Sequence, residues 1–87
     1  MEKEYRITYS GLRKLEDELQ ELKTTRRVEV AKKIKEAREQ GDLSENKEYD
    51  AAKDEQRKIE NRIEELNKIL GSAVIVDEGE DENFRKQ

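Results

Sequence analysis

The 87-residue sequence contains neither cysteine nor histidine. Their absence excludes disulfide bonds, thiolate nucleophiles and zinc sites built on imidazole or thiolate ligands. It also excludes catalysis by a Ser-His-Asp or Cys-His arrangement. Chemistry involving this chain must therefore depend on carboxylates, on cationic side chains, or on a bound group.

Proline is also absent, and apolar residues are scarce. The lack of proline suits long uninterrupted helices. Hydrophobic residues make up 31% of the chain and charged residues 48%, and the net charge is -4. A compact globule needs more apolar surface than this, whereas a two-helix coiled coil buries only a narrow seam. The composition therefore favours an elongated helical protein of one domain.

Long apolar segments are missing as well. No run approaches the roughly 20 apolar residues that span a membrane, and the N-terminus lacks the apolar core of a signal peptide. We therefore expect a cytoplasmic protein without a membrane partner.

The apolar residues that are present recur at helical spacing in two long runs. The first run comprises Leu12, Leu15, Leu19, Leu22, Val30, Ile34 and Ala37, and the second comprises Tyr49, Ala52, Gln56, Ile59, Ile63, Leu66 and Leu70. Steps of three and four residues are typical of the seam of a coiled coil. From Leu19 to Val30 the first seam takes an eleven-residue step, which predicts locally relaxed supercoiling and brings Arg26 or Arg27 close to the seam.

A short break that opens with glycine, at residues 41–46, separates the two runs. Such a break between two helices predicts a chain reversal. We predict an all-α fold, a long antiparallel two-helix coiled-coil hairpin over residues 1–71 with an acidic tip at 41–46. At 1.5 Å per residue, a helix of about 30 residues spans about 45 Å.

The base of the hairpin carries local signals. Thr8 or Ser10 can be the N-cap of the first helix, because a hydroxyl accepts from a free backbone amide. Thr8 is favoured, because Ile7 then precedes the cap and Leu12 follows as its hydrophobic staple partner. Ala73–Val76 is a β-prone run, but an isolated strand is not stable. We expect residues 72–87 to form a short β-prone or disordered tail, the start of a C-terminal domain that is missing here.

Charge is segregated along the hairpin. Residues 23–38 contain seven basic and two acidic side chains, and residues 39–50 contain five acidic and one basic. A solvated helical surface explains most of these charges individually. The segregation predicts a positive shank behind a negative tip, which suits a phosphate-lined or acidic surrounding.

Gly41 is the residue at which the first helix is expected to stop. Two carboxylates of the predicted tip follow it, Asp42 and Glu45. One interpretation is a capping box, in which Asp42 caps the second helix and Glu45 reaches back; Ser44 is the alternative cap. The other interpretation is functional, because carboxylate oxygens are ligands for Mg²⁺. Two carboxylates alone leave most of the six positions of this ion to waters, substrate or a partner.

The stretch from Ala37 to Lys53, A-R-E-Q-G-D-L-S-E-N-K-E-Y-D-A-A-K, resembles the signature of the bacterial transcript cleavage factors GreA and GreB. Residues 8–22 resemble the start of the family's first helix, and residues 67–77 resemble its link to the next domain. The resemblance covers about residues 5–77. It corresponds to the N-terminal coiled-coil domain of the family and not to the FKBP-like domain that normally follows.

This resemblance implies a function at bacterial RNA polymerase. The family inserts its coiled coil through the secondary channel and stimulates hydrolysis of backtracked nascent RNA near its 3′ end. The two tip acids of the family, which match Asp42 and Glu45, help to bind the second Mg²⁺ of the active centre. Arg38 and Lys53 match the family's basic patch near the RNA. The chain is then expected to stimulate the polymerase rather than to act as a free-standing nuclease.

Other signature residues are expected to shape the tip or to contact polymerase. They are Leu43, Ser44, Asn46, Glu48 and Tyr49. Tyr49 also lies on the predicted seam, so packing near the tip is its simplest role. Leu43 either folds back onto Tyr49 or meets a partner.

One departure from the family pattern keeps other functions open. Lys47 stands where the family usually has a small residue. A cation beside the acids is compatible with a channel-inserting inhibitor that does not stimulate cleavage. A structural coiled-coil adaptor, which contacts other helices through apolar positions such as Val28, Ala31 and Ile69, is the third alternative.

Overall fold

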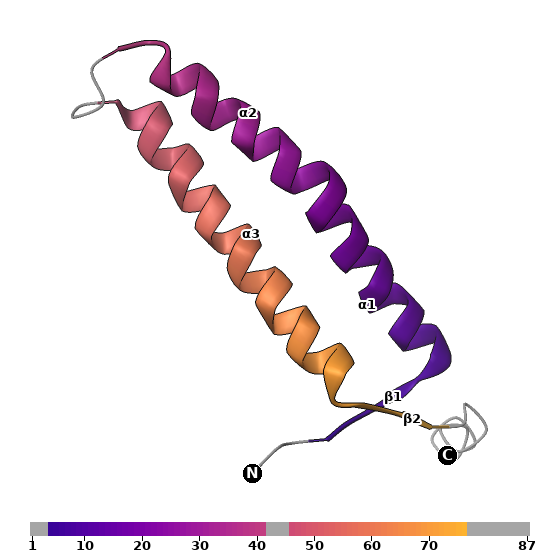
Figure 1. The fold of residues 1–87 in the computed structure, drawn as a ribbon. Helices are drawn as coiled ribbons and strands as arrows, with labels where there is room; N and C mark the ends of the chain where they lie inside the picture. Colours follow the sequence, from indigo (N-terminus) through magenta and orange to yellow (C-terminus); the bar gives the residue numbers. More distant parts are fainter. Residues whose placement is uncertain (1–3, 42–45, 77–87) are drawn as a thin grey trace, which may run out of the picture.

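The computed structural model is a narrow rod made of two antiparallel helical arms (Figure 1). It describes residues 4–41 and 46–76, and its principal extents are 59, 27 and 22 Å. The first arm consists of α1 (Tyr9–Glu21), the π-helical turn η1 (Leu22–Arg26) and α2 (Arg27–Arg38), and the second arm is the single helix α3 (Lys47–Gly71). The predicted helical hairpin is confirmed.

The core is a narrow seam between α2 and α3. Its buried apolar residues all occupy predicted seam positions: Val30, Ile34, Ala37, Ala52, Ile59, Ile63 and Leu66. Helix α1 contributes no fully buried side chain. Leu19 of α1 and Leu22 of η1 pack, partly buried, against the cluster formed by Val30, Ile59 and Ile63. Burial therefore extends along the seam from Ala37 and Ala52, next to the tip, to Leu66, toward the base.

The first arm begins at a side-chain cap. The hydroxyl of Thr8 accepts a hydrogen bond of 3.1 Å from the backbone N–H of Gly11, which confirms the predicted N-cap. A Cβ atom at Gly11 would lie 3.0 Å from Cγ1 of Ile7. A larger residue at this position would therefore require the side chain of Ile7 to shift by a few tenths of an ångström.

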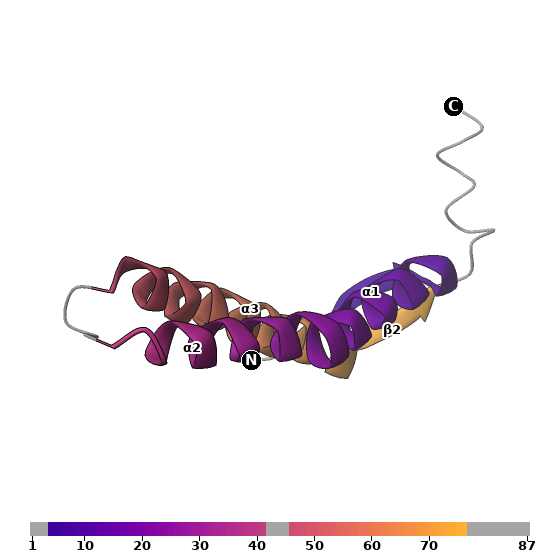
Figure 2. The same ribbon diagram turned by 90° about the horizontal axis from the view of Figure 1, so that it is seen from above.

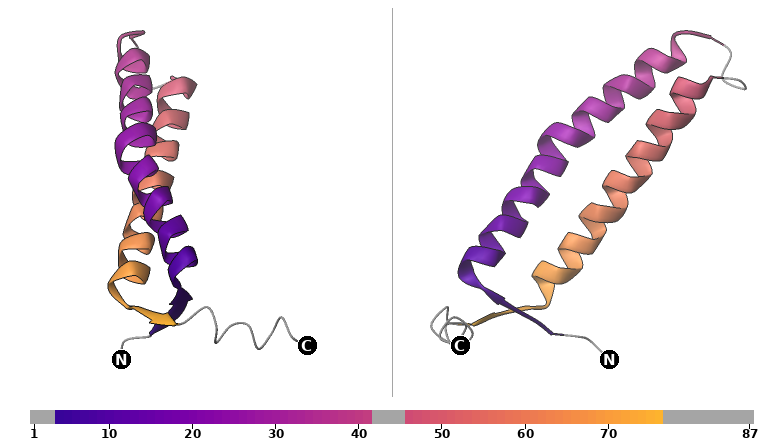
Figure 3. Two further views of the ribbon diagram at one scale, coloured as in Figure 1. Left: turned by 90° about the vertical axis from the view of Figure 1, so that its right-hand side faces the viewer. Right: turned by 180° about the vertical axis from the view of Figure 1, so that it is seen from behind.

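Two short parallel strands close the base of the rod, β1 (Tyr5–Thr8) and β2 (Ala73–Val76) (Figure 3). The backbone N–H of Tyr5 also donates to the C=O of Ser72 at 3.1 Å. The β-prone run is thus a strand, as expected. Its partner was not predicted, because the first residues of the chain read as a polar lead and the whole hairpin separates the two strands in sequence.

The interruption of the first seam is a local π turn. The backbone N–H of Arg27 donates to the C=O of Leu22, five residues earlier. A discontinuity was predicted between Leu19 and Val30, but its form is different: one π turn absorbs it, rather than relaxed supercoiling over the whole step. The first arm bends between α1 and α2 (Figure 2), as helices do at π turns.

Two bidentate ion pairs connect the arms. Glu18 of α1 accepts from Arg62 at 2.7 and 3.0 Å, and Arg27 of α2 donates to Glu60 at 2.7 and 2.8 Å. The hydrogen bond from Arg62 lowers the pKa of Glu18, and the hydrogen bond from Arg27 lowers the pKa of Glu60. Both pairs are partly exposed, so solvent screens them and each contributes little to the stability of the hairpin.

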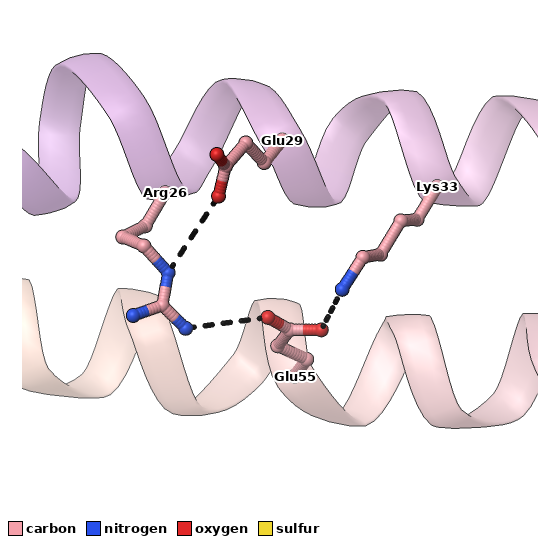
Figure 4. Close-up of polar contacts among 4 residues, drawn as sticks. All are labelled: Arg26, Glu29, Lys33 and Glu55. Atoms are coloured by element: carbon pink, nitrogen blue, oxygen red, sulfur yellow. Dashed lines mark hydrogen bonds and ion pairs between the residues drawn. The ribbon is translucent and has the colours of Figure 1, made fainter.

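A third, looser group of charges lies between these pairs and the tip. Figure 4 shows Glu55 of α3 between two cations of the first arm, with Lys33 at 3.3 Å and Arg26 at 3.4 Å. The Nε of Arg26 is also 3.9 Å from Glu29. Hydrogen bonds from Lys33 and then Arg26 lower the pKa of Glu55. Basic groups of the shank are thus partly neutralised across the seam.

Candidate functional site

The candidate site is the end of the rod where α2 gives way to α3. Helix α2 ends at Arg38, and the backbone N–H of Gly41 donates to its C=O at 3.1 Å. Gly41 has φ of 109°, a conformation that side-chain-bearing residues rarely adopt, and it is exposed. Its predicted role as the residue at which the first helix stops is consistent with this geometry.

Asn46 closes the other side of the tip. Its Oδ1 accepts from the backbone N–H of Tyr49 at 3.0 Å, which makes Asn46 the N-cap of α3. Its Nδ2 donates to the C=O of Ala37 at 2.7 Å. One side chain therefore caps the second arm and ties it to the last turns of the first.

This cap corrects an expectation. Asp42 or Ser44 was predicted to cap the second helix, but α3 begins at Lys47 and is capped by Asn46. Asp42, Leu43, Ser44 and Glu45 lie outside the described residues. The structure describes the residues on either side of this segment, and the end of α2 and the start of α3 lie at the opposite end of the rod from the strands (Figure 1).

Small side chains line the seam next to the tip. Ala37 and Ala52 are only 3% and 4% exposed, and Tyr49 is half-buried in the first turn of α3. A groove of about 290 Å³ includes the two alanines in its lining, which consists of Lys33, Glu36, Ala37, Gln40, Glu48, Ala51, Ala52 and Glu55. Three alanines form part of its lining, and most of the other lining residues are charged. The groove therefore reflects the close packing of the two arms and does not present a catalytic group.

The predicted basic residues lie on different arms. Arg38 is the last residue of α2, and Lys53 lies in the second turn of α3 with its Nζ donating to Oε1 of Gln56 at 3.2 Å. Both are exposed, as are Lys47 and Glu48 at the start of α3. Each arm therefore carries a solvent-accessible cation close to the tip.

Residues 4–41 and 46–76 contain no group of three or more histidine, cysteine, aspartate or glutamate side chains arranged to hold a metal ion. Within the same residues, no helix is both long and apolar enough to cross a membrane. The proposed magnesium ligands, Asp42 and Glu45, fall in the segment that the structure does not describe.

A second concavity, near the base, was not predicted. It is lined by Tyr9, Arg13, Glu16, Asp17, Leu19, Gln20, Lys23 and Leu70. The guanidinium carbon of Arg13 lies 6.0 Å from the ring centre of Tyr9, and the hydrogen bond between these side chains raises the pKa of Arg13. Acidic and basic groups mix along this wall, so no single ligand chemistry converges there.

These features define a class of protein: an elongated helical hairpin whose two arms flank, in the sequence, a short acidic segment at 42–45, and whose base is closed by a pair of strands. The family model described as "Transcription elongation factor, N-terminal" matches residues 5–75. The chain therefore belongs to the GreA/GreB family of transcription elongation factors, and the match is to the N-terminal region of that family.

Three relatives illustrate the extent of the similarity, and each is called transcription elongation factor GreA. The protein of Lachnoclostridium phytofermentans is 68% identical over 79 residues, which cover 91% of this chain and 49% of the relative. That of Thermoanaerobacter pseudethanolicus is 58% identical over 78 residues, covering 90% and 50%. That of Staphylococcus aureus (strain JH9) is 53% identical over 85 residues, covering 98% and 54%. The chain spans about half the length of these relatives.

Proposed function

We propose that this chain is the part of a transcription elongation factor that enters bacterial RNA polymerase. The rod inserts through the secondary channel, and its tip reaches the active centre and stimulates hydrolysis of backtracked nascent RNA. The observation that carries the proposal is the shape of the domain, 59 Å long and no more than 27 Å wide, with the end of α2 and the start of α3 at the end of the rod away from the strands (Figure 1). Membership of the family supports it.

Asp42 and Glu45 are the proposed ligands of a shared ion. Carboxylate oxygens are suited to Mg²⁺, and two of them fill too few positions to hold it alone. The remaining ligands would come from the polymerase and the RNA, so the chain is a stimulator and not a free-standing nuclease. Asp42 and Glu45 would help to hold a second magnesium ion, which would supply charge stabilisation for the attacking water and the leaving group.

Described residues support the delivery of these acids. Gly41 and Asn46 fix the two ends of the segment that carries them, through the turn after α2 and the amide bridge to Ala37. Arg38 and Lys53 provide cations for RNA phosphates near the 3′ end. The proposed contacts of the tip with polymerase involve Leu43, Ser44, Glu48 and Tyr49.

The proposal is tested with a purified backtracked elongation complex whose RNA is labelled at its 5′ end. The chain is assayed alone, and also joined to the remaining half of the 68% identical relative, because it spans about half of that protein. Asp42→Asn and Glu45→Gln should each abolish transcript shortening. Glu39→Gln and Asp50→Asn, the same two chemical changes at exposed residues on either side of the tip, should each retain it.

Other outcomes would favour other functions. Lys47 is exposed at the first position of α3; if the parent slows RNA synthesis without shortening the transcript, the chain is an inhibitor. Val28 is 61% exposed on α2; if the chain associates with itself or with other helices and does not bind polymerase, it is an adaptor. Either result would overturn the proposed role of the acids.

A further inference from the structure

The seam of the first arm changes phase by one residue at η1. An uninterrupted heptad from Leu22 would continue through Arg26, Glu29, Lys33 and Glu36. The positions that the structure buries are each one residue later: Val30, Ile34 and Ala37. The first arm therefore contains one residue more than a continuous α-helix would need to present its apolar face to α3.

The π turn accommodates this extra residue. Because a π turn closes its hydrogen bond over five residues instead of four, the bond from Arg27 to Leu22 returns the chain to the same face after a five-residue step. Leu22 at the start of the turn consequently packs on the same cluster as Val30 beyond it, together with Ile59 and Ile63 of α3.

The extra residue is confined to this turn by its neighbours on both sides. If it moved to the base side, the positions facing α3 would be Arg13, Glu16, Gln20 and Lys23; if it moved to the tip side, they would be Arg26, Glu29, Lys33 and Glu36. Either shift would replace apolar seam residues by charged or polar ones. The pairs Glu18–Arg62 and Arg27–Glu60 hold the arms together on either side of the turn.

The backbone inside the turn is the weaker part of the arm. The hydroxyl of Thr24 donates to the C=O of Gln20 at 2.8 Å, a contact that competes with the helical ladder and bends helices. From Lys23 to Arg26 every side chain is exposed, and no residue of η1 is buried. Local opening here therefore exposes little apolar surface.

We infer that η1 is a one-residue register insertion, and that it forms a joint at which the rod opens locally while both flanks stay packed. Removing one residue from it converts the five-residue step from Leu22 to Arg27 into a four-residue step. The first arm then becomes a continuous α-helix with an unbroken heptad. This inference concerns the folding of the chain alone and does not depend on the proposed function.

The test compares two one-residue deletions in the 87-residue chain. Deletion of Thr25, within η1, should leave the thermal midpoint equal to or above that of the parent. Deletion of Lys58, an exposed residue of α3 with no π turn to absorb the change, should lower the midpoint by more than about 10 °C. Amide hydrogen exchange in the parent should be faster at residues 23–27 than in α1 or α2, and deletion of Thr25 should slow it.

Two results would overturn the inference. One is a loss of stability on deleting Thr25 as large as that on deleting Lys58. The other is protection of residues 23–27 in the parent equal to that of the flanking helices. Val30→Ala, made in the parent and in the Thr25 deletion, checks that the seam is unchanged. We expect the same drop in thermal midpoint in both backgrounds. A smaller drop in the deletion background would also contradict the inference.

Discussion

Asn46 makes two hydrogen bonds with one side chain, and replacing it separates their contributions. Asn46→Ala removes both the cap to the N–H of Tyr49 and the bridge to the C=O of Ala37. Loss of an N-cap costs about 0.5–2 kcal/mol, and loss of a hydrogen bond typically costs about 0.5–1.5 kcal/mol. We therefore expect the free energy of unfolding to fall by about 1–3.5 kcal/mol.

Asn46→Ser is the informative partner of this variant. The serine hydroxyl can still cap α3 but is too short to reach Ala37, so only the bridge is lost. We expect Asn46→Ser to recover about half or more of the stability lost by Asn46→Ala. Urea unfolding of the chain, followed by circular dichroism at 222 nm, measures all three proteins under identical conditions.

Asn67→Ala is the matched control, because Asn67 is an exposed residue within α3. The same chemical change there should leave stability unchanged or slightly raised, since alanine favours helix more than asparagine does. If Asn46→Ala behaved like Asn67→Ala, Asn46 would not join the arms. If Asn46→Ser were as unstable as Asn46→Ala, the separation of cap and bridge would be wrong.

Three further perturbations test other parts of the structure. Gly41→Ala should destabilise the chain by about 1 kcal/mol or more, because φ of 109° is unfavourable for alanine, and urea unfolding would reveal it. Leu66→Ala, at a fully buried position, should cost about 2–5 kcal/mol, while Val28→Ala, at a position 61% exposed, should cost little; equal thermal midpoints would contradict the seam. The pKa of Glu18 is lower in the folded state than its ordinary value of 4.5, so the unfolded state binds a proton first and the free energy of unfolding should fall as pH drops below that value. Arg62→Ala should flatten this part of the profile of stability against pH. An unchanged profile would show that the ion pair does not contribute.

The parts of the fold that follow local rules could be predicted from the sequence. Burial at every third or fourth position fixes the face of each helix, and the buried residues from Val30 to Leu66 all lie on the predicted seams. Thr8 was recognisable as a cap because capping depends on neighbouring amides. The hairpin followed because a glycine-led break between two such helices leaves little alternative to reversal.

The parts that depend on distant contacts could not. Asp42, Ser44 and Asn46 are all good N-cap residues, and the choice of Asn46 coincides with its bridge to Ala37 on the other arm. The strand Tyr5–Thr8 has no strong β signal of its own and is stabilised by Ala73–Val76. These contacts depend on the completed hairpin, which local sequence patterns do not encode.

The π turn falls between these cases. In the structure the seam steps by five residues, from Leu22 to Arg27. Arg27 is charged, so the sequence alone does not identify it as a seam position. The apolar residues alone suggested an eleven-residue step from Leu19 to Val30. The hydrogen bond from Arg27 to Leu22 is what locates the extra residue.

The central claim is that the tip brings two carboxylates to a magnesium ion held mainly by polymerase. The most direct test is the Mg²⁺ dependence of RNA cleavage in a backtracked complex saturated with the parent, with Asp42→Asn/Glu45→Gln, or with the control Glu39→Gln/Asp50→Asn. The parent and the second double variant should lower the Mg²⁺ concentration needed for half-maximal cleavage, and the first double variant should leave it at the value of polymerase alone. An equal reduction by all three proteins would contradict the account.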